Sequence, residues 1–304
     1  MRDSKGSGAP TGEQYAITGG DYEAVVVEGG GGLRSLTYAG RPLVDTYEQS
    51  ETITGGRGQV LLPWPNRIRD GAYTFGGTGY QLALSEPDQH NATHGLVRWC
   101  SWRPDSWGRE HVRLRYRLVG QSGYPWPLDL GADYSLSADG LVVTLSAENL
   151  ADVPVPFAAG MHPYLSVGGR VDEAVLTLPA GKRQLVDERK LPTSLVAAAN
   201  EYDFGTGRRI GDLVLDDAYT DLRRGGDGRA VVRLEGGGHA VELWLDESWA
   251  YVQVFTGDAL SSGAREALAV EPMTAPADAF NSGSDLIELA PGQTWSGSFG
   301  IRAA

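Results

Sequence analysis

A carboxylate closes an apolar run near the carboxyl-terminal end of the chain. The run Ala267–Val270 leads into Glu271, and Pro272 follows at once. Such a run is typical of a buried strand, and proline has no N–H for a sheet, so the strand is expected to end there. Partial burial raises a carboxyl pKa toward neutrality, which suits a general base. Because glutamate is seldom buried, the alternative is a surface residue beside a turn.

A histidine stands in similar surroundings. His162 lies within the mostly apolar stretch 157–165 and is followed directly by Pro163. Imidazole titrates near neutrality, so it can donate a proton at physiological pH and take it back. The alternative is a core histidine whose ring is bonded to a backbone carbonyl.

A third polar group lies in the proline-framed stretch 61–71, where Asn66 and Arg67 adjoin each other. A guanidinium offers a rigid fork of donors suited to hydroxyl or carboxylate oxygens. Trp64, close by, is a candidate to stack on the apolar face of a sugar ring. The alternative for Arg67 is an ordinary salt bridge to Asp70 or to another carboxylate.

His90 and His94 stand four residues apart, a spacing that on a helix would present two metal ligands on one face. Their acidic and glycine-containing neighbours predict no helix, and a third ligand is missing, so no metal site is expected. Cys100 is the single cysteine, which excludes an internal disulfide and a cysteine metal cluster.

The composition is that of a soluble globular protein of 304 residues, with a formal net charge of −13. That charge disfavours nucleic acid and anionic membranes as partners, and mildly disfavours a phosphorylated substrate unless a local group of arginines overrides it. No segment resembles a signal peptide or a membrane span, so a cytoplasmic location is expected. By composition, residues 1–13 are expected to form a disordered leader.

Short strands separated by glycine turns are expected throughout, and the 42 glycines and 16 prolines fit many turns. The alternation of apolar and polar residues favours antiparallel sheets with one packed face. We therefore predict an all-β fold, a large antiparallel β-sandwich in a single domain over residues 14–304. The runs 230–234, 240–245 and 251–255 are predicted to form one meander, and 191–200 could hold a turn or two of helix. The strands expected with the clearest patterns are 22–27, 33–38, 113–118, 128–136, 141–145 and 295–301.

Five pieces, taken in order, resemble the aldose 1-epimerase (galactose mutarotase) family over nearly the whole chain. They are Pro65-Asn66-Arg67-Ile68-Arg69-Asp70-Gly71, His94-Gly95, His162-Pro163-Tyr164, Leu215-Asp216-Asp217-Ala218-Tyr219, and Glu271-Pro272-Met273-Thr274 with Ala279-Phe280-Asn281. The resemblance implies a β-sandwich of the galactose mutarotase type with a sugar cleft on one sheet face. It also implies interconversion of the α and β anomers of a free aldose, with a small sugar as substrate and no metal or organic cofactor.

By position, Glu271 resembles the family's general base and His162 its general acid. Arg67, His94 and Asp216 resemble residues that hold sugar hydroxyls or steady the transition state, and we place Asn66 with them. Asp217 is the rival to Asp216, which is preferred because it stands three residues before Tyr219. The galactose enzymes resemble Asp-His-Asn-Phe at this point, so the departure in this chain favours a broader bacterial branch and leaves the particular aldose open.

The mechanism that follows has Glu271 take the proton of the anomeric hydroxyl while His162 protonates the ring oxygen, the two converging from opposite sides of one sugar ring. Three rival functions remain open. One is a sugar-binding protein without catalysis. Another is a hexose-6-phosphate 1-epimerase with Arg67, Arg69 and Arg98 as its cations. The last is a glycosidase that uses Glu271 and Asp216.

Overall fold

The structure, a computed structural model, describes residues 8–261 and 263–304. The largest sheet has nine strands, and each pairing between neighbours is antiparallel. Its order is β10 (Arg103–Trp107), β11 (His111–Leu118), β12 (Leu128–Ser137), β13 (Gly140–Asn149), β27 (Thr294–Ala303), β23 (His239–Leu245), β22 (Ala230–Gly236), β17 (Val175–Thr177) and β20 (Arg208–Arg209).

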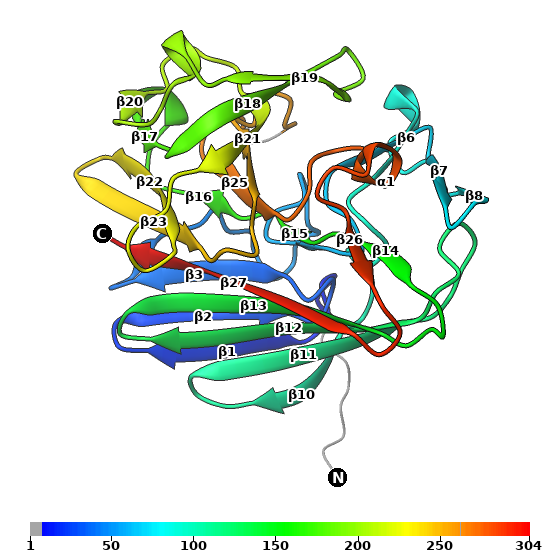
Figure 1. The fold of residues 1–304 in the computed structure, drawn as a ribbon. Helices are drawn as coiled ribbons and strands as arrows, with labels where there is room; N and C mark the ends of the chain where they lie inside the picture. The colour runs from blue at the N-terminus through cyan, green and yellow to red at the C-terminus, as the bar shows by residue number, and fades with distance from the viewer. Residues whose placement is uncertain (1–7, 262) are drawn as a thin grey trace.

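A second sheet of eight strands carries Glu271 and Asp216, and His162 lies between two of its strands. Its order is β19 (Pro192–Ala197), β18 (Ala180–Val186), β21 (Asp216–Leu222), β24 (Tyr251–Phe255), β25 (Leu268–Met273), β15 (Gly160–Met161) and β5 (Val60–Leu61), with β16 (Tyr164–Leu165) also paired to β25. In Figure 1 the strands β18, β21 and β25 lie at the opposite end of the molecule from β10, β11 and β12.

The remaining elements are small. A four-stranded sheet runs β1 (Gln14–Gly19), β2 (Tyr22–Val27), β3 (Leu33–Tyr38) and β4 (Arg41–Pro42), and three further pairs are β6 (Arg67–Arg69) with β9 (Asn91–Thr93), β7 (Ala72–Phe75) with β8 (Thr78–Gln81), and β14 (Val155–Phe157) with β26 (Ile287–Leu289). The helical turns are α1 (Ala279–Ser282), η1 (Pro87–Gln89), η2 (Val171–Glu173) and η3 (Asn200–Tyr202). In the part of the chain described, no helix has the length and apolar character needed to cross a bilayer.

The alternation seen in the sequence is confirmed in the large sheet. In β12 the side chains at even positions face the core, where Leu128, Leu130 and Tyr134 are fully buried. On the neighbouring β11, Arg113 and Arg117 are exposed, as expected for a solvated face. Each large apolar side chain moved from water into the core contributes about 1.5–3 kcal/mol, so this one-sided pattern drives the two sheet layers together. The all-β, antiparallel prediction is therefore confirmed.

The predictions for residues 251–255 and 191–200 are wrong. The run 251–255 leaves the expected meander because β27 already occupies the free edge of β23, so β24 crosses to the other sheet between β21 and β25. Residues 192–197 form β19 rather than helix, because the backbone there pairs with β18.

The strand that holds Glu271 also runs further than expected. Pro272 lies inside β25, and Met273 pairs with Tyr251 on one side and Gly160 on the other. The proline removes a single donor, and pairing of its neighbours on both edges carries the strand past it.

The expected disordered leader divides into two parts. Residues 1–7 lie outside the described residues. Thr11 is buried, and its carbonyl accepts a hydrogen bond of 2.8 Å from the Gly29 N–H. Thr11 is therefore packed against the domain, and the Glu13 carbonyl accepts from the Glu28 N–H at 3.0 Å although its side chain is exposed, contrary to the expectation for that stretch.

Candidate active site

The register of the eight-stranded sheet brings distant polar residues onto one face. Gln253 on β24 pairs directly with Glu271 on β25, and Asp216 on β21 lies two residues from the partner of Gln253. Side chains two residues apart on a strand share a face. The three side chains therefore project from the same side of the sheet.

His162 reaches Glu271 from the opposite edge of β25. Gly160 pairs with Met273 and Tyr164 pairs with Ala269, so one register runs through β15 and β16 and sets His162 across from Glu271. The imidazole Nε2 lies 3.2 Å from the carboxyl Oε1.

The two side chains are almost closed off from solvent, with 6% of His162 and 2% of Glu271 exposed. His162 also stacks on the Tyr164 ring, with centroids 5.0 Å apart and planes at 11°. The second atom of each group, His162 Nδ1 and Glu271 Oε2, is buried with no hydrogen-bond partner among the described residues. Buried polar atoms are nearly always bonded, and because both residues line the same cavity, these two atoms are candidates to bond a ligand there.

Burial raises the pKa of the Glu271 carboxyl well above its usual value, and the Asp216 charge adds to the shift against the opposing effect of Arg67. Burial also lowers the pKa of His162 to about 3, with Arg98 as the next cause. A desolvated site disfavours the charged form of each group. In the free site the proton of this pair is therefore held by the carboxyl rather than by the imidazole.

The two-stranded β6–β9 sheet supplies a second set of polar groups. Asn66 and His94 flank its paired strands, and the backbone N–H of Asn66 donates to His94 Nδ1 at 3.3 Å. Burial, followed by the effect of His162, lowers the pKa of His94 well below its usual value, so the ring is neutral. Because Nδ1 accepts, the hydrogen of the neutral ring is on Nε2, where it is available to donate.

Arg67 forms the ion pair that the alternative interpretation foresaw, but with a carboxylate other than Asp70. Its Nε and Nη2 donate to the two oxygens of Glu86 at 2.7 and 2.8 Å. Asn91 Nδ2 donates to the same carboxylate at 3.1 Å. This bidentate pairing fixes the plane of the guanidinium while the side chain still lines the cavity.

Strand alternation separates Asp216 from Asp217. Asp216 lines the cavity, accepts from Gln253 Nε2 at 2.7 Å and pairs with Lys190 Nζ at 3.2 Å. Asp217 points to the other side of β21, where the Arg183 Nε donates to it at 2.9 Å. Of the two aspartates, Asp216 is the one in reach of a ligand.

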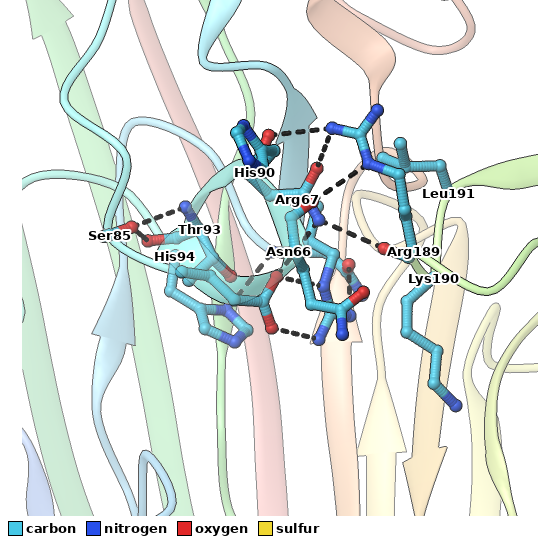
Figure 2. Close-up of polar contacts among 12 residues, drawn as sticks. Asn66, Arg67, Ser85, His90, Thr93, His94, Arg189, Lys190 and Leu191 are labelled. Atoms are coloured by element: carbon cyan, nitrogen blue, oxygen red, sulfur yellow. Dashed lines mark hydrogen bonds and ion pairs between the residues drawn. The ribbon is translucent and has the colours of Figure 1, made fainter.

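Arg189 fastens the segment that carries Lys190 to the part of the chain between β6 and β9. Its guanidinium donates to the carbonyl oxygens of Gln89 and His90 at 2.9 and 2.8 Å and to Asp70 at 2.7 Å. Figure 2 shows Arg189 reaching the backbone at His90 while Lys190 extends in the opposite direction. The clamp holds the β18–β19 connection beside the cavity.

All six residues predicted for the site line one cavity of about 300 Å³. Trp64 does not take part: it is 2% exposed and packs against Phe280, so the sugar-stacking role considered for it is wrong. Trp99 lines the cavity instead and is 66% exposed. The complete lining is Ile53, Gly55, Gly56, Asn66, Arg67, His94, Arg98, Trp99, His162, Tyr164, Asp216, Gln253, Phe255 and Glu271.

A sequence model of the family described as "Aldose 1-epimerase" matches residues 13–302. The chain belongs to the aldose 1-epimerase family. The uncharacterized protein YihR of Escherichia coli K12 is 35% identical over 289 residues, which are 93% of this chain and 91% of that protein. The resemblance read from the five sequence pieces is thereby confirmed.

Solved structures of similar proteins share the fold. The GalM/aldose epimerase homologue from Caenorhabditis elegans has a TM-score of 0.85 at 20% identity, covering 96% of this chain and 98% of that one. Galactose 1-epimerase from Lactobacillus acidophilus has a TM-score of 0.79 at 20% identity, covering 94% and 92%. At such identities the likeness establishes the β-sandwich of the galactose mutarotase type and nothing finer.

In this member of the aldose 1-epimerase family, sequence reasoning missed Gln253 and Glu86. The amide of Gln253 interrupts the apolar run 251–255, and a polar group inside a buried strand is a signal that could have found it. Glu86 lies in a polar turn and gives no such signal. Among residues 8–261 and 263–304, no group of three His, Cys, Asp or Glu is arranged to hold a metal ion.

Proposed function

We propose that the protein interconverts the α and β anomers of a free aldose, with Glu271 and His162 as its acid–base pair. The observation that carries the proposal is the 3.2 Å contact between their side chains in the cavity, each with a second polar atom left unbonded. A binding protein without catalysis has no need of a buried acid–base pair. Burial of such groups costs free energy unless a ligand or a reaction uses them.

The chemistry explains why the pair is in contact. Anomerisation needs a proton to leave the hydroxyl on carbon 1 and another to reach the ring oxygen, and both oxygens are bonded to that same carbon. An acid and a base that lie close together can therefore serve both oxygens. Because the two side chains are in contact, we propose that Glu271 and His162 act from one side of the ring rather than from opposite sides.

One proton shared by the pair is sufficient. Whichever group holds it acts as the acid, the other acts as the base, and after ring opening the assignments reverse for closure. The sequence-based proposal of Glu271 as base and His162 as acid requires the proton on the imidazole, whereas the free site favours the carboxyl. We therefore describe the pair as one titrating unit, which contributes about 10²–10⁴-fold for each proton transfer.

The remaining polar groups suit the hydroxyls of a single sugar ring. Asp216 and the Gln253 carbonyl accept hydrogen bonds, while Arg67, Asn66 and the His94 Nε2 hydrogen donate them. A donor at His94 is also placed to stabilise charge that grows on an oxygen during ring opening. A volume near 300 Å³ fits a monosaccharide better than a chain of sugars.

The test is the rate of anomer exchange at equilibrium, followed by NMR exchange between the two anomeric protons of glucose and of galactose. The protein should raise the exchange rate in proportion to its concentration. Sugar binding without faster exchange would leave only the non-catalytic function. Release of a sugar from an aryl glycoside would favour a glycosidase.

A further inference from the structure

Arg98 lines the same cavity as the acid–base pair, four residues after His94. Its backbone is held in place, since its carbonyl accepts from Gln59 Nε2 at 2.9 Å. Its guanidinium, in contrast to its backbone, is not held by any bond to a described residue. Within residues 8–261 and 263–304 no hydrogen bond or ion pair engages it, and the Trp99 ring centroid lies 6.0 Å from the guanidinium carbon.

The other permanent charges that line the cavity have partners. Arg67 is bound by both oxygens of Glu86, and Asp216 is paired with Lys190. Glu86 is the carboxylate that acts on Arg98 electrostatically, yet both of its oxygens are already taken by Arg67. Arg98 is left as an uncompensated positive charge.

The titrating groups do not supply the missing negative charge. Burial drives His94 to its neutral form and favours a neutral Glu271–His162 pair. The Arg98 side chain is partly withdrawn from water, which is unfavourable for a guanidinium without a counter-ion, and its five donors bond none of the described residues. The cavity therefore lacks one anion, in a protein whose overall charge of −13 would otherwise repel one.

We propose that the aldose bound in this cavity carries a single negative charge, which the Arg98 guanidinium binds through its fork of N–H donors. The inference rests on the proposed function and adds the class of substrate. A planar carboxylate or a singly charged tetrahedral oxyanion matches the fork and the one uncompensated charge. A phosphate monoester, at about −1.5 to −2 near neutral pH, exceeds that charge. The exposed ring of Trp99 lies beside the guanidinium and offers an apolar surface to the sugar.

The anion also affects the chemistry. Arg98 is one cause of the lowered pKa of His162, second to burial. A substrate anion bound to Arg98 would offset that effect and ease transfer of the proton from Glu271 to the imidazole. A charged substrate would thereby move the pair toward the form in which the carboxylate is the base.

The experiment compares four sugars by NMR exchange of their anomeric protons: glucose, glucuronate, glucose 6-sulfate and glucose 6-phosphate. All leave carbon 1 and the ring oxygen free. The sulfate and phosphate share a tetrahedral shape but differ in charge. We expect the two singly charged sugars to have the highest kcat/KM. Glucose or the phosphate equalling them would overturn the inference, whereas failure of all four sugars would overturn the proposed function itself.

Variants test whether Arg98 is the residue that causes the preference for charged sugars. In Arg98→Gln the ratio of kcat/KM for glucuronate to that for glucose should fall about 10- to 100-fold, the range of a hydrogen bond to a charged group. Arg98→Lys should retain part of the ratio because it keeps the charge. Arg113→Gln, with the same loss of charge on the exposed face of β11, is the matched control. An unchanged ratio in Arg98→Gln, with both activities reduced alike, would show a structural role only.

Discussion

Two clusters of buried charge in this protein are built in opposite ways. The first surrounds Arg265, which is 9% exposed and uses all three of its guanidinium nitrogens. Nε donates to Asp172 at 2.6 Å, Nη1 donates to Asp258 at 2.8 Å, and Nη2 donates to the Gly211 carbonyl at 2.7 Å. Burial pulls the pKa of Asp258 upward, but hydrogen bonds from Thr256 and Arg265 outweigh it and lower the pKa. This cluster is ionised and bonded throughout.

The second cluster is the Glu271–His162 pair. It is at least as buried, but one atom of each group is unbonded and burial drives both groups toward neutrality. A fully bonded network stabilises a fold, and a partly bonded one is a liability unless a ligand completes it. The difference therefore separates a structural cluster from a functional one, and four experiments test that separation.

The largest effect is expected from Glu271→Gln. The amide keeps the shape of the side chain but cannot exchange a proton, so kcat/KM for anomer exchange should fall about 10²–10⁴-fold. Stability should rise at pH 7. A carboxyl whose folded-state pKa is raised loses stability as the pH climbs above its unfolded-state value near 4.5, and glutamine has no such loss. Exchange NMR and urea unfolding measure the two effects, and a fully active variant would contradict the assignment.

At the Arg265 cluster we expect the reverse result, a loss of stability without a loss of activity. Arg265→Met leaves Asp258 without its cation and leaves Asp172 with only the exposed Arg170, and we expect a loss of about 2–3 kcal/mol in the free energy of unfolding. The folded fraction should keep its exchange activity. Arg170→Met is the control, because Arg170 pairs with the same Asp172 from an exposed position and should cost about 1 kcal/mol at most. Equal losses in the two variants would show that burial of Arg265 is unimportant.

A smaller effect is expected at Arg67, which lines the cavity and is itself held by an ion pair with Glu86. Glu86→Gln removes one charged partner of Arg67, so the guanidinium is less firmly oriented, and kcat/KM should fall about 10-fold. The loss should lie mainly in KM, because Arg67 is proposed to hold the sugar in the ground state and transition state alike. Glu23→Gln, on the exposed side of β2, is the control. A loss confined to kcat would place Arg67 in the chemical step.

The smallest effect concerns pH. Because the folded-state pKa of His162 is lowered to about 3, the unfolded chain binds more protons between that pH and about 6.5. This titration therefore contributes stability that rises with pH across the window, against the fall that Glu271 contributes above about 4.5. His162→Gln should remove the rising contribution, so the slope of unfolding free energy against pH should be less positive than in the wild type, as measured by urea titrations at several pH values. The same slope in variant and wild type would mean that His162 is protonated in the folded protein.

Local patterns in the sequence were sufficient for much of the fold. The strands 22–27, 33–38 and 251–255 have the bounds that their alternation or apolar runs predicted. That local signal arises because a strand's side chains face core and solvent in turn. The same alternation allows only one of Asp216 and Asp217 to face the cavity, although the sequence does not show which face is which.

What the sequence could not supply is pairing between distant segments. Nothing near Glu271 reveals that β15 and β16 set His162 opposite it, because register depends on which edges remain free after the sheets assemble. The crossing of β24 into the second sheet also depends on a distant strand, because β27 occupies the edge of β23. Glu86 could not be assigned to Arg67, because a surface carboxylate and a guanidinium partner look alike in any polar stretch.

The position of β25 has a consequence for how such proteins diversify. Its Glu271 is fixed by paired backbone on both edges, whereas Arg98, Trp99 and Lys190 come from segments outside those strands. In the proposed scheme, the acid–base pair and the residue that selects a charged sugar therefore lie in different segments of the chain. We expect that exchanging segments 86–99 and 187–191 between relatives changes the preference for one sugar over another while Glu271 and His162 keep their positions.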